Sequence, residues 1–294
     1  MAGLSCALEC FDIQLDVIVL EMQGVVGGQV TEIPFHVRNV AAGVYDDEHP
    51  LPLALDRSVA ILGDRARRSW PVDRADLAER WVQSAGRRLT AGTIVITTGV
   101  GLRRLPAAAD GAFGGDVTYE LGSDLDRFAG RPVVVIGGGD NATLDALALA
   151  RAGSSVTLVH RSDHLGSRPD IAGQLRDDPH ITELAGWDLD EVRGGDRLQE
   201  VVLVRPATGE RRSVKASGLV VKVGKAPRTD LFRDQLEVDR SGAVVVDGAL
   251  ATSRPGVFAA GDVVAGAYWR IATAIGQGSL AARSVLRYLA SAPR

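Results

Sequence analysis

The segment Val133–Ala142, VVVIGGGDNA, constrains the fold of this chain more than any other stretch. A short apolar run leads directly into three glycines and then into a helix-forming stretch, which satisfies the pattern G-x-G-x-x-G/A. The first glycine permits a sharp turn, the third lets the backbone approach a pyrophosphate, and alanine allows close helix–strand packing. The free N–H groups at the helix start suit phosphates. The predicted contacts are Gly137, Gly139, Asp140, Asn141 and Ala142.

The next predicted strand, residues 155–160, indicates which dinucleotide this turn would bind. Sites that prefer NAD(H) carry an acidic residue at the end of this strand, where it holds the ribose hydroxyls. Here the strand ends in His160 followed by Arg161, and a cation suits a 2′-phosphate. The pair therefore favours NADP(H). Arg168 is either a second phosphate contact or a solvated charge of the loop.

Strands and helices alternate along the chain, which predicts an α/β fold with parallel sheets and crossover helices. A hairpin is expected around the turn at 84–86, and another hairpin-like stretch around 242–246. Helices are predicted at 3–10, 51–62, 142–151 and 271–289. Buried strands are predicted at 16–20, 93–97, 133–136, 155–160, 201–204, 218–223 and 257–260.

Composition excludes several classes of function. The net charge of −4 on 294 residues offers no broad basic field for nucleic acid or an anionic membrane. No apolar run is long enough to span a bilayer, and no signal peptide is evident, so a cytoplasmic location is expected. Cys6 and Cys10 are spaced as two packed residues of a helix, and not as a CxxC redox centre. The five histidines are scattered without metal-ligand spacing.

Three motifs occur in an order that resembles a known family. They are IGGGDNA, VTLVHR and, near the end, TSRPGVFAAGDVV. Together they resemble the thioredoxin reductase family of flavoproteins, which includes thioredoxin-reductase-like ferredoxin/flavodoxin–NADP reductases. The resemblance implies two Rossmann-like domains, with the NADP(H) domain (116–239) inserted into a discontinuous FAD domain (1–115 and 240–294). It also implies hinges near 114–116 and 239–242, and a homodimer.

The same resemblance implies an FAD site. Glu21 would hold the adenosine ribose hydroxyls, the Gly27–Gln29 turn would lie beside the isoalloxazine ring, and Asp262 would accept a hydrogen bond from a ribityl hydroxyl. A helix starting after Trp269 would stabilise negative charge on the reduced flavin, and Trp269 itself would lie near the ring. The full implied set is Gly3, Glu21, Gly27, Gly28, Gln29, Thr98, Gly99, Gly261, Asp262, Arg270, Ile271 and Ala272.

The N-terminus departs from the family pattern. The family begins with a strand and the turn G-x-G-P-A-G, but Met1–Ser5 matches only the last residues of that motif. The first strand of the FAD domain is therefore apparently missing, and that strand is central in a doubly wound sheet. Either the true start lies upstream and restores the strand, or the protein has lost it and binds FAD poorly or not at all.

Two further departures concern the reaction. The stretch 114–123 holds no cysteine where thioredoxin reductases place CxxC, so dithiol exchange by this chain alone is excluded. The pattern is thus nearer the ferredoxin/flavodoxin–NADP reductase branch. The family's HRRxxxR loop keeps one arginine here, Arg161, which weakens the preference for NADPH.

The resemblance implies hydride transfer from NADPH C4 to flavin N5, followed by electron transfer to a non-dithiol acceptor. The acceptor would be a ferredoxin, a flavodoxin or a small organic substrate. The flavin carries the chemistry, so no side chain need act as nucleophile or base. Two alternatives stay open: an FAD-deficient, non-catalytic NADP(H)-binding relative, and a flavin-dependent biosynthetic tailoring enzyme.

Overall fold

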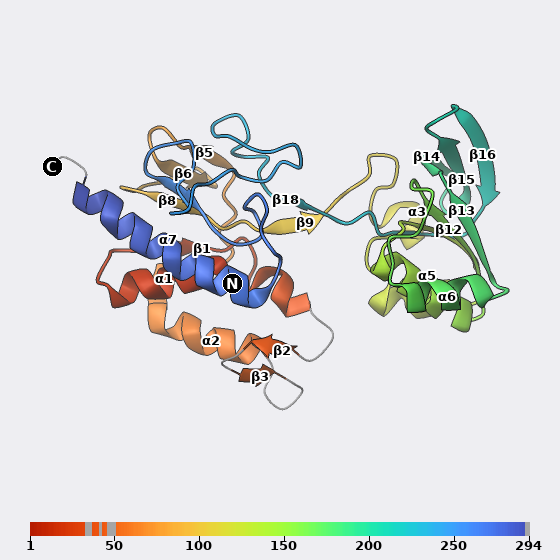
Figure 1. The fold of residues 1–294 in the computed structure, drawn as a ribbon, viewed down its shortest axis with the longest axis horizontal. Coiled ribbons are helices and arrows are strands. Elements are labelled where there is room, and N and C mark those ends of the chain that lie inside the picture. The colour runs from red at the N-terminus through yellow and green to blue at the C-terminus, as the bar shows by residue number, and fades with distance from the viewer. Residues whose placement is uncertain (33–36, 41–42, 46–50, 292–294) are drawn as a thin grey trace. The chain divides into compact units, whose positions relative to one another are not determined.

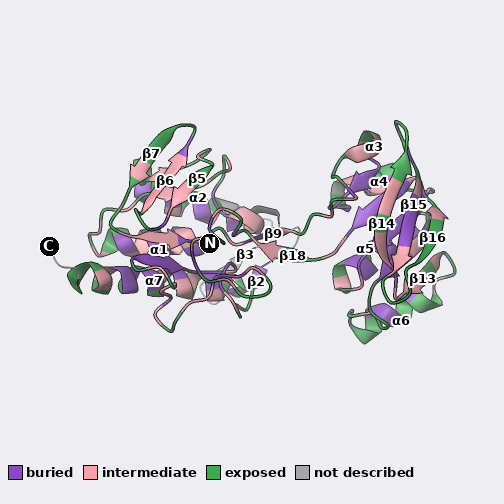
Figure 2. Cartoon of the chain, turned by 90° about the horizontal axis from the view of Figure 1, so that it is seen from above, coloured by how far each residue is buried: buried purple, intermediate pink, exposed green. Residues whose placement is uncertain are grey.

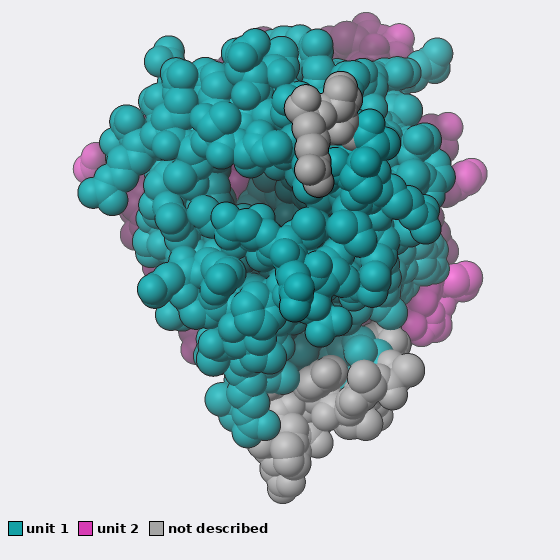
Figure 3. Space-filling view, turned by 90° about the vertical axis from the view of Figure 1, so that its left-hand side faces the viewer, with its two compact units in different colours: residues 1–101, 226–294 teal, residues 102–225 magenta. Residues whose placement is uncertain are grey.

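The computed structural model describes residues 1–32, 37–40, 43–45 and 51–291. The chain divides into two compact units, coloured separately in Figure 3. Unit 1 comprises residues 1–101 and 226–294, and unit 2 comprises residues 102–225. The sequence analysis expected the NADP(H) domain at 116–239, with hinges near its two ends. The corresponding unit 2 begins and ends 14 residues earlier, at 102 and 225. At those points β9 (Val100–Leu102) pairs with β18 (Lys225–Pro227).

Unit 2 is built on a five-stranded parallel sheet with the order β10-β17-β11-β12-β13. Its middle strands consist mostly of branched apolar residues that are buried on both faces, as strands covered on both sides require. The predicted βαβ unit is confirmed, because β11, α5 and β12 follow one another at the expected residues. The elements are β10 (Val117–Thr118), β11 (Pro132–Ile136), α5 (Asp140–Arg151), β12 (Ser155–His160), β13 (Ile181–Ala185) and β17 (Gly218–Val221).

Different elements cover the two faces of this sheet. On one face α5 packs beside α6 (Pro169–Asp177), and Leu149 and Leu175 enter the same buried cluster as Val133. On the other face an antiparallel meander contributes Trp187, Val201 and Leu203 to a second cluster. The meander is β14 (Asp188–Gly194), β15 (Leu198–Arg205) and β16 (Glu210–Lys215), and the short helices are α3 (Ala112–Gly115), η3 (Gly122–Asp124) and α4 (Leu125–Phe128). Of the meander, only the β15 strand is predicted from the sequence.

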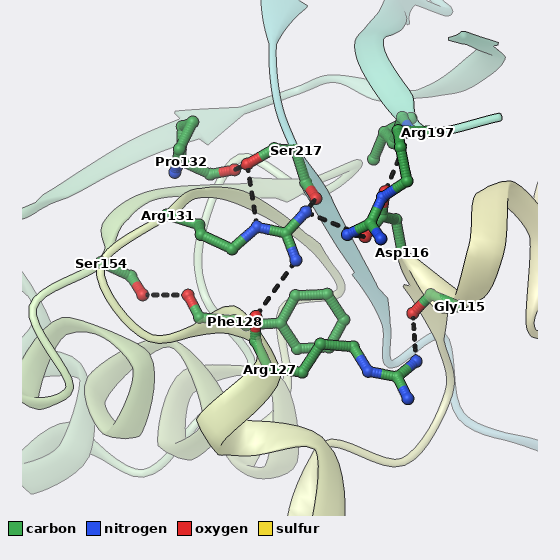
Figure 4. A network of polar contacts seen from close by, with 10 residues as sticks. Gly115, Asp116, Arg127, Phe128, Arg131, Pro132, Ser154, Arg197 and Ser217 are labelled. Atoms are coloured by element: carbon green, nitrogen blue, oxygen red, sulfur yellow. Dashed lines mark hydrogen bonds and ion pairs between the residues drawn. The ribbon is translucent and has the colours of Figure 1, made fainter. Parts of the chain in front are cut away.

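A buried carboxylate joins the meander to the sheet. Asp116 has no exposed surface and accepts hydrogen bonds from Arg131 at 2.9 Å, Arg197 at 2.7 and 2.8 Å, and Leu198 N at 3.1 Å (Figure 4). Burial opposes ionisation of Asp116, but these donors outweigh it and hold the pKa of the carboxyl below its usual range. Its own carbonyl accepts a hydrogen bond from Leu219 of β17.

Unit 1 is organised around two helices that lie side by side, α1 (Ala2–Asp12) and α7 (Ile271–Ser291) (Figure 1). Their backbones touch at Gly278, where an added Cβ would lie 2.3 Å from the carbonyl oxygen of Ala2. The buried faces of α1 and α2 (Leu51–Leu62) meet through Leu4, Leu55 and Val59 (buried residues are purple in Figure 2). All three predicted helices of this unit are confirmed. None of the described helices combines the length and apolar character needed to cross a bilayer.

The strands of unit 1 form several small sheets. The remaining elements are β1 (Val19–Leu20), η1 (Gly28–Glu32), β2 (Val37–Val40), β3 (Gly43–Tyr45), η2 (Gly63–Arg65), β4 (Ala66–Arg67), β5 (Arg74–Asp76), β6 (Trp81–Ser84), β7 (Arg87–Thr90), β8 (Ile94–Ile96) and β19 (Val257–Ala259). The predicted hairpin around 84–86 is confirmed by the β6–β7 pairing. The predicted strand at 16–20 is reduced to two residues, and the stretch 242–246 makes only isolated bridges.

The parallel strands of unit 1 form two separate pairs, β1–β4 and β8–β19. Within the described residues no strand joins β1 to β8. The start of α1 touches both pairs, since an added Cβ at Gly3 would lie 2.6 Å from Thr97 Oγ1 and 3.8 Å from Val19 Cγ2. Among the described residues, α1 therefore lies beside two parallel pairs that are not joined to each other.

Replacing the buried carboxylate tests the link between the meander and the sheet of unit 2. We expect Asp116→Asn to destabilise unit 2 by about 2–3 kcal/mol at neutral pH, because two guanidinium groups lose their charged partner. Since the folded-state pKa is depressed, the stabilisation is present above about pH 4 and is lost as the pH falls through the folded value. The difference in the free energy of unfolding between the variant and the wild type should therefore become smaller at acid pH.

Amide hydrogen exchange measures this change, with peptides from β11 and β17 reporting unit 2 and peptides from α1 and α7 serving as internal control. The matched variant is Asp126→Asn, since Asp126 is an exposed aspartate of α4 with no ion pair in the described structure. Equal exchange rates in Asp116→Asn and Asp126→Asn at neutral pH would contradict the conclusion that Asp116 stabilises unit 2.

Candidate cofactor sites

The glycine turn of unit 2 lies where a dinucleotide would approach the carboxyl edge of the sheet. Gly137 has a φ of +141°, and an added Cβ would lie 2.3 Å from the carbonyl oxygen of Lys222. At Gly138 an added Cβ would lie 2.9 Å from the Cβ of His160. At Gly139, which is exposed, it would meet nothing within 4 Å. Protein atoms therefore require glycine at the first two positions, whereas the third opens onto free space.

Helix α5 begins directly behind this free space. Gly139 is its N-cap residue and provides no side-chain cap, and its carbonyl accepts a hydrogen bond from Thr143 N at 3.1 Å. The N–H groups of Asp140, Asn141 and Ala142 have no carbonyl one turn back to bind, as at any helix start. Ala142 is buried and packs in the core of the unit. The turn and helix thus form a cradle that fits a pyrophosphate in shape and dipole.

The segment after β12 is tied back onto the glycine turn. Gly166 N donates to the carbonyl of Gly138 at 2.8 Å, and Arg168 N donates to Asp140 Oδ1 at 2.8 Å. The guanidinium of Arg168 also lies 3.7 Å from the Asp140 carboxylate. Arg168 therefore balances Asp140 at the helix start, and its side chain is largely exposed, as the interpretation as a solvated loop charge expects.

His160 and Arg161 differ sharply in exposure. The His160 ring is buried, its Nε2 lies 3.0 Å from Glu183 Oε1, and its Nδ1 has no hydrogen-bond partner. Arg161 is exposed. The sequence analysis paired both residues at a 2′-phosphate, but of the two only Arg161 is exposed, and His160 is buried. His160 instead packs beneath the turn, against Gly138.

Lys222 is a residue of this site that the sequence analysis missed. It follows β17 at the carboxyl edge of the sheet, and its N–H donates to the carbonyl of Ile136 at 2.7 Å. Its ammonium lies 3.2 Å from Asp145 Oδ2 on α5, with both side chains mostly buried. Burial raises the pKa of Asp145 despite this cation. The available signal was a lysine directly after the buried run GLVV.

In unit 1, two carboxylates predicted for FAD lie near the start of α1. Burial lowers the pKa of the Met1 amino group, while the nearby negative charges of Glu21 and Asp262 act to raise it. Glu21 also accepts a hydrogen bond from Gln23 N at 2.9 Å through its side chain. The turn that bears Glu21 and the turn that bears Asp262 thus converge on one helix N-terminus.

The Gly261–Asp262 turn is packed tightly against α1. Gly261 has a φ of +84°, an added Cβ would lie 2.8 Å from the Cβ of Ala2, and its N–H donates to Gln277 Oε1 at 2.7 Å. Helix α7 then begins at Ile271, with Ala272 in its first turn. Arg270 precedes the helix, and its guanidinium lies 4.8 Å from the ring centre of Tyr268.

The other predicted turns of unit 1 adopt glycine-specific backbone conformations. Gly27 and Gly28 have φ values of +135° and +57°, and Gln29 follows within η1. Gly99 has a φ of +63°, and Arg228 N donates to its carbonyl at 2.9 Å. Thr98 Oγ1 donates to the carbonyl of Arg228 at 2.7 Å. The Thr98–Gly99 turn is therefore bonded to the returning segment of its own unit.

The two cysteines lie in the interior of unit 1. Cys6 and Cys10 are both buried, on the face of α1 that packs with Ala274 and Ala281 of α7. A hydrogen bond with Cys10, together with burial, raises the pKa of the Cys6 thiol, which disfavours the nucleophilic thiolate. Among the described residues no group of three or more His, Cys, Asp or Glu could hold a metal ion, and His36 and His49 lie outside those residues.

Comparison with known proteins assigns the family. Residues 1–278 match the family described as pyridine nucleotide-disulphide oxidoreductase. The chain belongs to this family. It is 37% identical over 210 residues to a thioredoxin reductase of Streptomyces clavuligerus, covering 71% of this chain and 65% of that protein. The matched region thus spans slightly less than two thirds of the relative's length.

Two further comparisons cover nearly the whole chain. It is 26% identical over 292 residues to the 34.2 kDa protein in the rubredoxin operon of Clostridium pasteurianum, covering 98% of this chain and 94% of that protein. The crystal structure of Lactococcus lactis thioredoxin reductase in the FR conformation matches with a TM-score of 0.77 and 26% identity, covering 99% of this chain and 96% of that one. The two-domain Rossmann-like fold is thereby confirmed, and the thioredoxin reductase-like family uses FAD and NADPH.

Replacing Gly139 by alanine tests whether the glycine turn binds a ligand or serves only the fold. We expect Gly139→Ala to unfold at the wild-type temperature, because its Cβ meets no protein atom. Its affinity for NADPH should fall on the order of tenfold or more, since the Cβ would occupy the space that a pyrophosphate needs. Isothermal titration calorimetry with NADPH measures the change, and Gly173→Ala, another open glycine in α6, is the control. Unchanged NADPH affinity in Gly139→Ala would remove the cradle assignment.

Proposed function

We propose that this chain is an NADPH-dependent flavoprotein oxidoreductase that passes electrons through FAD to an acceptor other than a dithiol of its own. The proposal that the acceptor is not a dithiol of this chain rests on the position of its cysteines. The chain has two cysteines, both buried in α1, and none in the stretch 114–123. A dithiol relay needs an accessible thiolate, which neither cysteine supplies.

In this proposal unit 2 binds NADP(H). The pyrophosphate would lie on the N–H groups at the start of α5, in the space left open at Gly139. Arg161 would contact the 2′-phosphate from the surface, where a guanidinium can donate two parallel hydrogen bonds. His160 would support the turn from below, and Lys222, paired with Asp145, would tie the end of β17 to α5 beside the cradle. Arg168 would neutralise Asp140 so that the site accepts an anion.

Unit 1 would hold FAD between the start of α1 and the turns that converge on it. Glu21 is suited to ribose hydroxyls, Asp262 to a ribityl hydroxyl, and the helix start at Ile271–Ala272 to negative charge on a reduced ring. Gly3, Gly27, Gly28, Gln29, Thr98, Gly99, Gly261 and Arg270 would complete the site. When bound, the flavin supplies the hydride acceptor and the electron outlet, and the protein's side chains only position it and exclude water.

The acceptor is proposed to be a ferredoxin, a flavodoxin or a small organic substrate, with the chain acting as a homodimer. A redox-protein acceptor is supported by the similarity to a protein of a rubredoxin operon over nearly the full length of both chains. The similarity to thioredoxin reductases argues for a thioredoxin-like partner, but the missing CxxC argues against direct reduction of one.

Spectroscopy of the purified protein tests this function directly. We expect a yellow protein whose visible flavin band bleaches when NADPH is added without oxygen and returns on addition of an oxidised ferredoxin or flavodoxin. Cys6→Ala with Cys10→Ala should bleach in the same way, because neither thiol takes part, and thioredoxin should restore no colour. Bleaching that depends on the cysteines, or thioredoxin reduction by the chain alone, contradicts the proposed acceptor class.

The second candidate function is an FAD-deficient NADP(H)-binding protein. It is the alternative that the sequence analysis leaves open. A colourless protein that binds NADPH, and that added FAD does not colour, supports this candidate over the enzyme.

Arg161 is expected to determine the preference for NADPH. We expect Arg161→Ala to weaken NADPH binding about tenfold and to leave NADH binding unchanged, since only NADPH carries the 2′-phosphate. Titration calorimetry with both nucleotides measures the two effects. Arg212→Ala, an exposed arginine of β16 with no hydrogen bond or ion pair in the described structure, is the matched control. An equal loss for NADH would show that Arg161 acts on the fold and not on the phosphate.

A further inference from the structure

A pocket of about 580 Å³ lies along β4 in unit 1. Its walls come from the end of α2, from the chain between Gly63 and Trp70, and from Arg87 of β7. None of the residues predicted for the FAD site lines it. A volume of this size is within the usual range for small-molecule sites. The pocket is therefore a separate candidate site on the unit that is proposed to bind FAD.

The charge of this pocket is strongly positive for so acidic a chain. Three guanidinium groups line it, those of Arg67, Arg68 and Arg87, against the single carboxylate of Asp64. In the described part of the structure none of these three makes a hydrogen bond or an ion pair with a side chain. By contrast, Arg131 and Arg197 of unit 2 share a buried aspartate. Three arginines without counter-ions around one hollow offer a site for an anion.

An indole completes the pocket. Trp70 is half-buried and lines the hollow, and the guanidinium of Arg67 lies 5.8 Å from its ring centre. The Trp70 backbone is held in place, because its N–H donates to the carbonyl of Glu21 at 2.8 Å. An indole on a fixed backbone, with Arg67 near its ring and Arg68 and Arg87 without counter-ions among the described residues, combines a stacking surface for a flat ring with donors for phosphate.

We propose that this pocket, the Arg67–Trp70 pocket, binds a nucleoside phosphate. Arg67, Arg68 and Arg87 would donate to the phosphate oxygens, and the base would stack on Trp70. The concave shape and limited volume favour a small molecule over an acidic protein surface, since stable protein interfaces bury far larger areas. The site is independent of the proposed reaction.

The test uses ADP and pyrophosphate as probes, in titration calorimetry of protein loaded with one equivalent each of FAD and NADP⁺, so that no free excess competes for the pocket. The added cofactors block binding of ADP at the two proposed cofactor sites. We expect ADP to bind the wild-type chain and Arg67→Ala with Arg87→Ala to weaken it at least tenfold. Arg88→Ala is the matched control, because Arg88 is the next residue on β7 and its guanidinium lies over Trp81 instead, 3.8 Å from the ring centre.

Trp70→Leu tests the base-stacking part of the proposal. We expect it to weaken ADP about tenfold and to leave pyrophosphate unchanged, because only ADP carries a ring. The proposal is overturned by absence of ADP binding, by an equal loss in Arg88→Ala, or by ADP binding that Trp70→Leu does not alter. Displacement of ADP by polyglutamate at lower concentration than by ATP also overturns it, in favour of an acidic macromolecule. If the chain takes up no flavin but binds ADP in a way that requires Arg87, the proposal for the pocket is supported and the proposed flavoprotein function is contradicted.

Discussion

The contact between Gly137 and the carbonyl of Lys222 organises the nucleotide-binding edge of unit 2. The two strands are neighbours in a parallel sheet, so their carboxyl ends meet, and the chain can turn into α5 only if no side chain separates them. Once the turn is placed, Gly138 covers His160, Gly166 bonds back to Gly138, and Arg168 reaches Asp140. The anion cradle is thus a consequence of backbone packing, and the charged side chains are arranged around it afterwards.

In unit 1, close packing that requires glycine also occurs at the start of α1. Gly3 lies against Thr97, while Gly261 and Gly278 both lie against Ala2, so three glycines from distant parts of the chain converge on one helix N-terminus. The carboxylates of Glu21 and Asp262 act on the Met1 amino group at this same helix start. Helices α1 and α7 pack against both parallel pairs, β1–β4 and β8–β19.

Elements whose signal is local were predictable from the sequence. The β11–α5–β12 unit was, because its strand, glycines and helix are contiguous, and so was the hairpin around 84–86. Strand β14 was not, since its two aliphatic residues, Leu189 and Val192, lie three positions apart, which breaks the alternation that predicts a strand. The burial of His160 was also not predictable, because it depends on Glu183, which lies on the next strand. The Arg67–Trp70 pocket includes Arg87 from a separate hairpin, and no local sequence pattern predicts that these residues lie together.

The strand ends of the two units differ in charge, and this difference bears on the direction of electron flow. After β1 the chain presents Glu21, an acceptor suited to a free diol, whereas after β12 it presents an exposed Arg161, a donor suited to a phosphate. A chain with two such ends would bind two different dinucleotides without competition between them. Because Cys6 and Cys10 are buried within α1, electrons delivered to unit 1 would have no thiol at the surface through which to leave. Their exit would have to be from the ring itself. With the ring at the proposed place, the acceptor would approach the start of α7, where Tyr268 and Trp269 are 70% and 43% exposed.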